Sequence, residues 1–258
     1  MSEPQARKAQ TFRDLHVPGR PLVLHNIWDA GSAVAVAGAG AAALATGSWS
    51  VAAAHGYPDG EQLPLDLVLA NSARISAAVP TLPLSLDLES GYGATAAAVG
   101  ETVARAIAAG VVGCNLEDSI VEGGALRPVQ AQAARFAAAR QAAQAAGIPV
   151  FINARCDVFF QSDGAAHDRA RVEMALERAR AYAAAGADGL FVPGLTDLAL
   201  IAAIVSASPL PVNIMAGARS PALAELAAVG VARVSHGPGP YRAAMALLQE
   251  RVRADFGS

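Results

Sequence analysis

Cysteine is scarce in this chain, and its scarcity excludes two kinds of site. The 258 residues contain two cysteines, Cys114 and Cys156, and both lie within apolar runs that are typical of strands. Neither has a Cys-x-x-Cys or a Cys/His spacing, which argues against a zinc site and against a redox-active pair. We therefore predict two buried free thiols rather than a disulfide or a nucleophile.

Charged and aromatic residues are also few, at 16% and 5% of the chain, and the net charge is -3. The 19 lysines and arginines are scattered rather than clustered, so we expect neither nucleic acid nor an anionic membrane as a partner. The alanine-rich run 30–45 is interrupted by glycines, which makes a membrane span a poor interpretation. Residues 1–13 are polar and lack the apolar centre of a signal peptide, so we expect a cytoplasmic protein.

Hydrophobic residues, by contrast, make up 53% of the chain, which is enough for a large core. Strand-like and helix-like stretches alternate from end to end. The expected strands are 21–27, 41–46, 82–88, 111–116, 149–154, 189–192, 211–215 and 232–235. The expected helices are 30–38, 51–55, 65–79, 94–109, 129–146, 166–185, 197–206, 221–229 and 241–256.

The expected strands are continuously apolar, which is typical of parallel strands that are covered on both faces. Eight strand–helix units in 258 residues predict a (β/α)8 TIM barrel, an α/β fold that we assign to residues 1–258 as a single domain. A doubly wound open sheet is the alternative. It usually carries a glycine-rich phosphate loop, and no GxGxxG or Walker sequence opens a helix here.

Acidic residues follow two neighbouring strands, at the ends where a barrel of this kind carries its chemistry. Asp87 lies at the end of strand 82–88 and Glu89 follows it, and Glu117 follows strand 111–116. Three carboxylates that converge without a cation would raise one another's pKa and destabilise the fold. The sequence thus predicts a metal site at Asp87, Glu89 and Glu117, with a salt-bridge network as the alternative. Ligands that are all oxygen favour Mg²⁺, with Mn²⁺ as a second possibility.

Further polar residues follow other strands. Arg155 could hold an anion with two parallel hydrogen bonds, or simply neutralise Asp157 or Glu117. The turn at Thr46, Gly47, Ser48 and Trp49 offers hydroxyls and backbone N–H groups to an anion, and Trp49 is either a pocket wall or part of the core.

Three other polar residues are candidates for the same end of the barrel. Asn213 lies just inside the seventh strand. His236 follows the eighth strand and is either an acid–base group or a structural histidine. Asp29 is at least as well explained as the cap of the following helix.

Four segments of the chain resemble those of a known family, the isocitrate lyase/phosphoenolpyruvate mutase superfamily. These segments are Gly56-Tyr57-Pro58-Asp59-Gly60, Asp87-Leu88-Glu89-Ser90-Gly91-Tyr92-Gly93, Asn115-Leu116-Glu117-Asp118 and Asn153-Ala154-Arg155-Cys156-Asp157. The resemblance implies a modified (β/α)8 barrel and a helix-swapped oligomer, so we expect a homodimer or a homotetramer.

The resemblance also implies the chemistry. Mg²⁺ would be bound through Asp87, Glu89 and Glu117 with Asp59 nearby, and a 2-oxo or 2-hydroxy acid would bind on that metal. Its carboxylate would lie at the turn Gly47–Trp49, with Arg155 holding the anion. The predicted catalytic residues are Arg155, Glu117, Asp59 and His236. The predicted substrate-binding residues are Thr46, Gly47, Ser48, Trp49, Asp87, Arg155 and Asn213.

The loop 119–127 departs from the family pattern. It carries neither the Lys-Lys-Cys-Gly-His segment of the lyases nor the lysine and asparagine of the mutases. The proton donor is therefore open among Glu122, Arg127, Tyr92 and His236. We predict a Mg²⁺-dependent lyase that cleaves a C–C bond of a small 2-oxo or 2-hydroxy carboxylic acid through a metal-stabilised enolate. The alternatives are a phosphonate P–C mutase or hydrolase, and a non-catalytic barrel that binds 2-oxo acids.

Overall fold

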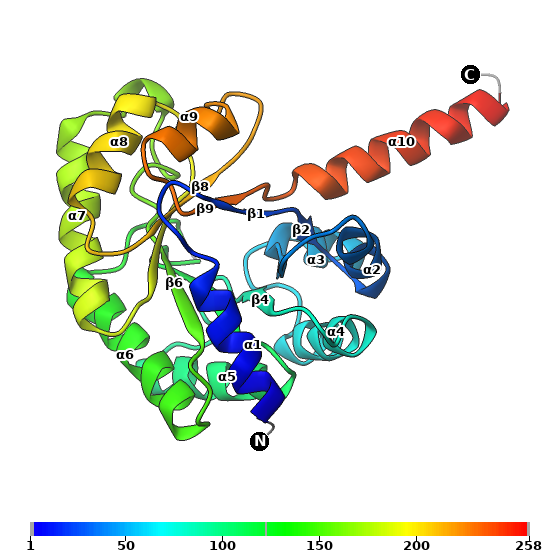
Figure 1. The fold of residues 1–258 in the computed structure, drawn as a ribbon, viewed down its shortest axis with the longest axis horizontal. Coiled ribbons are helices and arrows are strands. Elements are labelled where there is room, and N and C mark those ends of the chain that lie inside the picture. The colour runs from blue at the N-terminus through cyan, green and yellow to red at the C-terminus, as the bar shows by residue number, and fades with distance from the viewer. Residues whose placement is uncertain (1–2, 122, 257–258) are drawn as a thin grey trace.

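The computed structural model describes residues 3–121 and 123–256. Parallel strands form a ring at the centre, and helices surround it (Figure 1). The strands are β1 Leu22–Leu24, β2 Asn26–Ile27, β3 Leu44–Thr46, β4 Leu84–Asp87, β5 Gly113–Glu117, β6 Phe151–Arg155, β7 Gly189–Val192, β8 Val212–Met215 and β9 Arg233–Ser235. The α-helices are α1 Glu3–Asp14, α2 Ala30–Gly38, α3 Ser48–Ala54, α4 Leu65–Ala78, α5 Ala96–Ala108, α6 Val129–Ala145, α7 Arg169–Ala184, α8 Leu198–Ala207, α9 Leu223–Ala228 and α10 Gly239–Phe256.

The first predicted strand, 21–27, is bent at His25 and closes the ring. Its first half, β1, pairs with β9, and its second half, β2, pairs with β3. Asn26 joins the two sides of this seam, because its Nδ2 donates to the Thr46 carbonyl and its Oδ1 accepts from the Gly237 N–H, both at 2.8 Å. All pairs in the sheet are parallel and its order is β1-β9-β8-β7-β6-β5-β4-β3-β2, so the prediction of a (β/α)8 barrel is confirmed.

Helix α1 was not expected, because residues 3–14 are mostly polar. Its residues Ala9 and Phe12 are buried, and the Phe12 ring packs edge-on against Phe151 at the start of β6, at the end of the barrel opposite to the predicted site residues. A Cβ atom at Gly113 of β5 would lie 2.5 Å from the Phe12 ring, so only glycine leaves room for this contact. Two buried positions are too few to give a helical period that stands out in the sequence.

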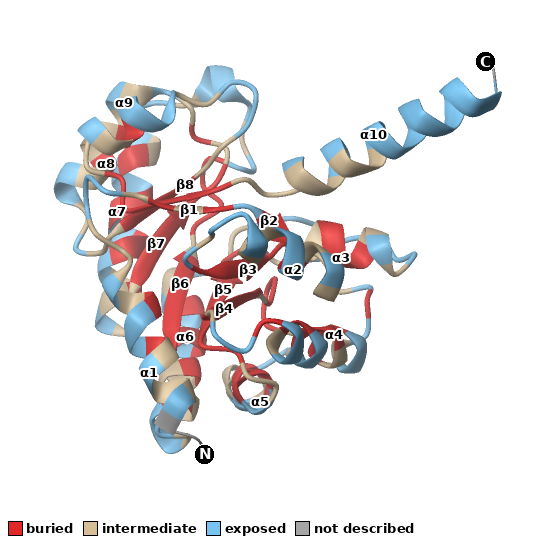
Figure 2. Cartoon of the chain, turned by 45° about the vertical axis from the view of Figure 1, so that its right-hand side comes forward, coloured by how far each residue is buried: buried red, intermediate tan, exposed pale blue. Residues whose placement is uncertain are grey.

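Helix α10 projects away from the barrel, and along most of its length it is exposed (Figure 2). Only its first turn is anchored: the ring of Tyr241 packs edge-on against Trp28 and Trp49, with centroids 5.1 and 5.9 Å apart. Within residues 3–121 and 123–256, no helix, α10 included, is both long and apolar enough to cross a membrane.

The core lies between the sheet and the helices that cover it, as the red strands of Figure 2 show. Cys114 and Cys156 are buried in it as free thiols, as predicted. The interior of the ring is instead partly polar. Arg233 of β9 is 1% exposed there, and buried asparagines from β5, β6 and β8 accompany it, namely Asn115, Asn153 and Asn213.

Candidate active site

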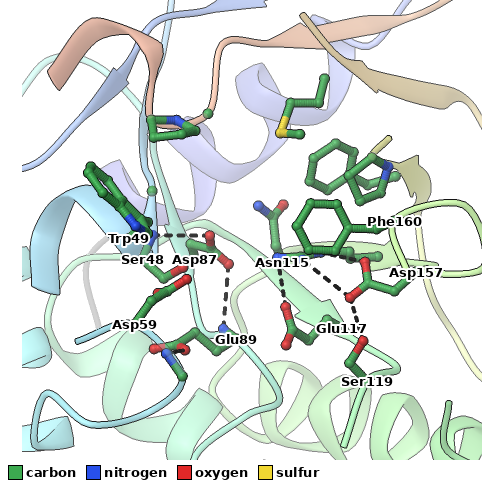
Figure 3. Close-up of a pocket in the computed structure, with 18 of the residues that line it drawn as sticks. Ser48, Trp49, Asp59, Asp87, Glu89, Asn115, Glu117, Ser119, Asp157 and Phe160 are labelled. Carbon is green, nitrogen blue, oxygen red and sulfur yellow. Dashed lines mark hydrogen bonds and ion pairs between the residues drawn. The ribbon is translucent and has the colours of Figure 1, made fainter. Parts of the chain in front are cut away.

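A cavity of about 530 Å³ opens at the carboxyl ends of the strands. It collects most of the predicted site residues from four different strand–helix loops, as the close-up in Figure 3 shows. The predicted residues that line it are Gly47, Ser48, Trp49, Asp59, Asp87, Glu89, Glu117 and Arg155.

Asp87 ends β4 at one side of this cavity (Figure 3). Its Oδ2 accepts from the backbone N–H of Ser48 at 3.1 Å, and its Oδ1 accepts from the N–H of Glu89 at 3.4 Å. Its own N–H donates to Oγ1 of Thr46 at 3.0 Å. Thr46 is 1% exposed and does not line this cavity, and the contact observed for its hydroxyl is the one that positions Asp87.

Glu89 holds two loops together. Its Oε2 accepts from the N–H groups of Gly60 and Glu61 at 2.8 and 2.7 Å, and its Oε1 accepts from the Tyr92 hydroxyl at 2.9 Å. Glu61, on the other loop, makes the reverse connection, because its Oε1 accepts from Ser90 Oγ and from the Tyr92 N–H. Glu61, Glu89 and Tyr92 all have φ between 50° and 58°, a strained conformation for residues other than glycine. These hydrogen bonds maintain that conformation beside the cavity.

Burial and mutual repulsion raise the pKa values of the carboxyl groups on this side. The pKa of Glu89 is raised to about 7, first by burial and then by the charges of Asp59 and Asp87. The pKa of Asp59 is raised by burial and by Asp87, although a hydrogen bond from Ser48 opposes the rise. Carboxyl groups with raised pKa values in a cavity are typical of functional sites.

Arg155 joins two carboxylates on the other side. Its Nη1 lies 2.7 Å from Oε2 of Glu117, and its Nε lies 2.7 Å from Oδ1 of Asp157. The Phe160 ring covers the guanidinium, with its centroid 4.9 Å from Cζ. Burial raises the pKa of Glu117, while the neighbouring Arg155 charge opposes the rise. Arg155 therefore neutralises both Glu117 and Asp157, the two roles considered for it from the sequence. Three of its five N–H groups contact these carboxylates, which leaves two for a ligand.

Comparison with known proteins identifies the family. The profile of the phosphoenolpyruvate phosphomutase family matches residues 12–255. The chain belongs to the isocitrate lyase/phosphoenolpyruvate mutase superfamily.

Three relatives within this superfamily illustrate its range. A crystal structure from Burkholderia cenocepacia J2315, provisionally named a phosphonomutase, is 56% identical, covers 98% of this chain and 100% of its own, and superposes with a TM-score of 0.94. An uncharacterized Mycobacterium tuberculosis protein is 35% identical over 95% of this chain and 88% of its own length. An oxaloacetate decarboxylase of Bradyrhizobium sp. is 32% identical over 81% of this chain and 70% of its own length.

Some predicted residues of this superfamily member lie outside the cavity lining. Asn213 is 1% exposed, and it exchanges hydrogen bonds with Ser235 inside the barrel at 3.0 Å. His236 stacks on His25 with centroids 4.3 Å apart, and its pKa is lowered by burial and by that neighbour. Asp29 caps helix α2 through the Ser32 N–H at 2.7 Å, which confirms its capping interpretation.

The structure describes two of the three other candidate proton donors, Tyr92 and Arg127. Tyr92 donates to Glu89, and Arg127 follows the hairpin that Ser119 and Leu126 bridge; neither lines the cavity. Glu122 lies outside the described residues.

Several lining residues were not predicted from the sequence. Asn115 lies inside the barrel, and Ser119 and Gln161 are polar residues of the loops after β5 and β6. Phe160, Phe191 and Met215 form an apolar wall, and Arg242 lies in the first turn of α10. Asn115 could have been found, because it stands two residues before Glu117 and strand side chains repeat on one face with that period. Phe191 and Met215 also lie on strands, whereas Ser119, Phe160 and Gln161 come from loops, where no such period exists.

The donor set fits a hydrated Mg²⁺ better than a closed protein cage. Within residues 3–121 and 123–256, no group of three or more His, Cys, Asp or Glu side chains is arranged to hold a metal by itself. Asp59, Asp87, Glu89 and Glu117 nevertheless line one cavity with Arg155 as the cation in contact with Glu117. Mg²⁺ usually keeps several waters and takes only one or two carboxylates directly, so this arrangement suits it.

Proposed function

We propose that the protein is a Mg²⁺-dependent lyase that cleaves a carbon–carbon bond of a small 2-oxo or 2-hydroxy carboxylic acid. One observation carries the proposal: Asp59, Asp87, Glu89 and Glu117 gather in a single cavity where negative charge exceeds positive charge. When bound, Mg²⁺ would offset this excess and supply positive charge where the breaking bond leaves its electrons. The family of lyases and mutases supports the reaction class.

Asp87 is the residue best suited to hold the ion directly, because its carboxylate faces the cavity and is held in place by Ser48. Glu89 already uses both oxygens to join two loops, so it suits an outer position, through water. Glu117 and Asp59 suit the same kind of position. Burial is the largest cause of their raised pKa values, and nearby like charges, which a dication would offset, add to it.

The substrate anion would bind between the turn Gly47–Trp49 and Arg155. Two N–H groups of Arg155 remain available to it, and the buried carboxylates of Glu117 and Asp157 hold the guanidinium in place. Glu117 is the best-placed acid–base group. Burial raises its pKa, although the Arg155 charge opposes the rise, so its carboxyl group exchanges a proton closer to neutral pH than that of a solvent-exposed glutamate.

The test is turnover of a substrate panel with Mg²⁺ and with a chelator, measured for wild type, Asp87→Asn and Asp66→Asn. Oxaloacetate comes first in the panel, because a relative is named for decarboxylating it. We expect Mg²⁺-dependent cleavage that Asp87→Asn reduces by ~100-fold, or about 2.7 kcal/mol in the barrier. Asp66→Asn is the matched control, since Asp66 lies exposed on α4 and pairs with Arg105.

Other results would replace the proposal. Turnover confined to phosphonates such as phosphonopyruvate would indicate P–C chemistry, which the family name and the provisional name of the Burkholderia protein suggest. Tight binding of 2-oxo acids without product would indicate a binding barrel. Full activity of Asp87→Asn, or activity that survives the chelator, would remove the metal assignment.

We also infer a homo-oligomer, a dimer or a tetramer. Helix α10 has no buried residue in the single chain, although Leu247, Leu248, Val252 and Phe256 give it apolar side chains. A second cavity lies on the outside of the barrel between the end of α1 and α2, and it is lined partly by Leu22, Val23 and Val36. A second copy that exchanges α10 would cover apolar surface of both kinds.

A further inference from the structure

Asn115 occupies the floor of the candidate active site. It lies on β5, two residues before Glu117 and in register with Asp87 of β4, so all three side chains point to the same part of the barrel. It is 4% exposed and lines the cavity. Figure 3 shows it at the centre, between Asp87 on one side and Asp157 on the other.

The direction of its carboxamide is determined from inside the barrel. Its Oδ1 accepts from Nδ2 of Asn153 at 2.9 Å and from Nη2 of Arg233 at 3.4 Å. Arginine can only donate hydrogen bonds, so the atom of Asn115 that faces Arg233 must be the oxygen. The Nδ2 amino group therefore points to the other side, away from the Arg233 guanidinium.

Within the part of the chain that the structure describes, that amino group has no protein acceptor. None of the hydrogen bonds among the described residues uses Nδ2 of Asn115, and the atom keeps contact with the cavity. A donor in a nearly buried position costs free energy when it lacks an acceptor. The surrounding carboxylates are engaged elsewhere: Asp87 with Ser48 and Glu117 with Arg155. The donor is thus oriented toward whatever occupies the cavity.

Arg233 packs on helix α1 at one end, where its Cζ lies 5.9 Å from the centroid of the Phe12 ring. It is 1% exposed, its Nη1 has no partner among the described residues, and burial lowers its pKa to about 10. Its other hydrogen bond, from Nε to Oγ of Ser235, is long at 3.3 Å. A buried cation with such weak hydrogen bonds is costly for the fold, and its contact with Asn115 connects it to the site.

We propose that Asn115 is a further substrate-binding residue, whose amide N–H donates to an oxygen of the bound carboxylic acid. Arg233 and Asn153 are positioning residues that keep this donor turned toward the substrate. The inference rests on the proposed function, because it takes the ligand of this cavity to be a carboxylic acid. It adds a neutral side-chain donor from β5 to the charged donor of Arg155 and the backbone donors of the turn Gly47–Trp49.

The test is calorimetric titration of oxalate, a small dicarboxylate, in the presence of Mg²⁺. Asn115→Asp keeps the shape of the side chain and the acceptor for Arg233, but it replaces the amino group with a second acceptor. We expect oxalate to bind at least ~10-fold more weakly, equivalent to about 1.4 kcal/mol. The thermal midpoint should not fall, because the new carboxylate pairs with Arg233. Asn71→Ser is the control. Asn71 is also buried, but it does not line the cavity, and its Nδ2 donates to the carbonyl of Trp28.

Two further variants keep the test decisive. Asn115→Ser removes the amide without adding charge, and it must also weaken oxalate binding. Arg233→Lys should weaken oxalate binding in the wild-type background but have little further effect on Asn115→Ser, because a positioning residue acts through its partner. A residue with only a structural role would give no such coupling.

The outcomes distinguish a failure of the role proposed for Asn115 from a failure of the proposed function. Wild type that binds oxalate while Asn115→Asp and Asn115→Ser bind it equally well would overturn the role of Asn115 and leave the proposed function standing. Wild type that shows no Mg²⁺-dependent oxalate binding would overturn both.

Discussion

Arg155 shows how one residue can serve structure and function together. Its guanidinium contacts Glu117, Asp157 and the Phe160 ring, so it is held more rigidly than an arginine that faces solvent. Those contacts explain why the carboxylates of the cavity are tolerated on that side. On the other side, Asp59, Asp87 and Glu89 have only hydrogen bonds from uncharged groups, and the pKa values of Asp59 and Glu89 are raised.

Replacing Arg155 with lysine tests whether its planar geometry matters. Lysine keeps the charge that Glu117 and Asp157 need, so the fold should persist, but it cannot offer parallel hydrogen bonds to an anion. We expect oxalate in the presence of Mg²⁺ to bind ~10-fold or more weakly, by about 1.4 kcal/mol. Trp49 lines the same cavity, and its fluorescence provides the measurement.

Arg171→Lys is the matched control for this prediction, because Arg171 lies on α7 and pairs with Asp168 outside the cavity. Near-normal oxalate affinity in Arg155→Lys would show that Arg155 only neutralises its two carboxylate neighbours.

Helix α1 depends on an uncharged histidine just beyond its last turn. The ring of His16 stacks on Phe151 with centroids 3.9 Å apart, and its Nδ1 donates to the Phe12 carbonyl at 2.7 Å. Burial, with a further contribution from the Arg233 charge, lowers the pKa of His16 to about 3. The folded protein therefore binds the proton on His16 less readily than the unfolded chain does.

This difference predicts an acid-sensitive contact. His16 contributes its full stabilisation above pH 6.5, and the contribution falls as the pH drops from 6.5 toward 3, because only the unfolded chain gains the proton there. The free-energy advantage of wild type over His16→Gln should shrink in that window by up to about 1.4 kcal/mol per pH unit. Urea unfolding at pH 7.5, 6.5, 5.5 and 4.5 measures it. Parallel curves for the two proteins would contradict the low pKa.

The shape of the molecule is dominated by a closed barrel with one helix that leaves it. The first turn of α10 is tied to the site, since Tyr241 packs on Trp49 and the Arg242 guanidinium lies 4.5 Å from the Trp49 ring centroid. The remainder of the helix is exposed. An assembly that covers α10 would consequently also restrain residues at the mouth of the cavity.

Disrupting the apolar side chains of α10 should dissociate the oligomer. We expect wild type to be a dimer or a tetramer and the double variant Leu247→Glu/Leu248→Glu to be a monomer, because two charges cannot be buried without partners. Size-exclusion chromatography with light scattering measures the masses, and circular dichroism checks the barrel. Met174→Glu, an equally exposed apolar position on α7, is the control. A wild-type monomer, or a double variant of unchanged mass, would refute the assembly.

The sequence by itself determined the barrel, most strand positions, the buried thiols and the carboxylates at the strand ends. These follow from local patterns: apolar runs, glycines after helices, and acidic residues just past a strand. Strand 189–192 was predicted at its observed bounds, and the others differ by a few residues at their ends.

Only the tertiary structure decided which of these residues meet. Arg155 contacts Glu117 because β5 and β6 pair in a register that places the two residues side by side. The direction of the Asn115 carboxamide depends on Arg233, which lies 118 positions further along the chain. The bend at His25 arises from closing the ring between β9 and β3. Each outcome depends on distances across the barrel, and a pattern confined to neighbouring residues carries no information about such distances.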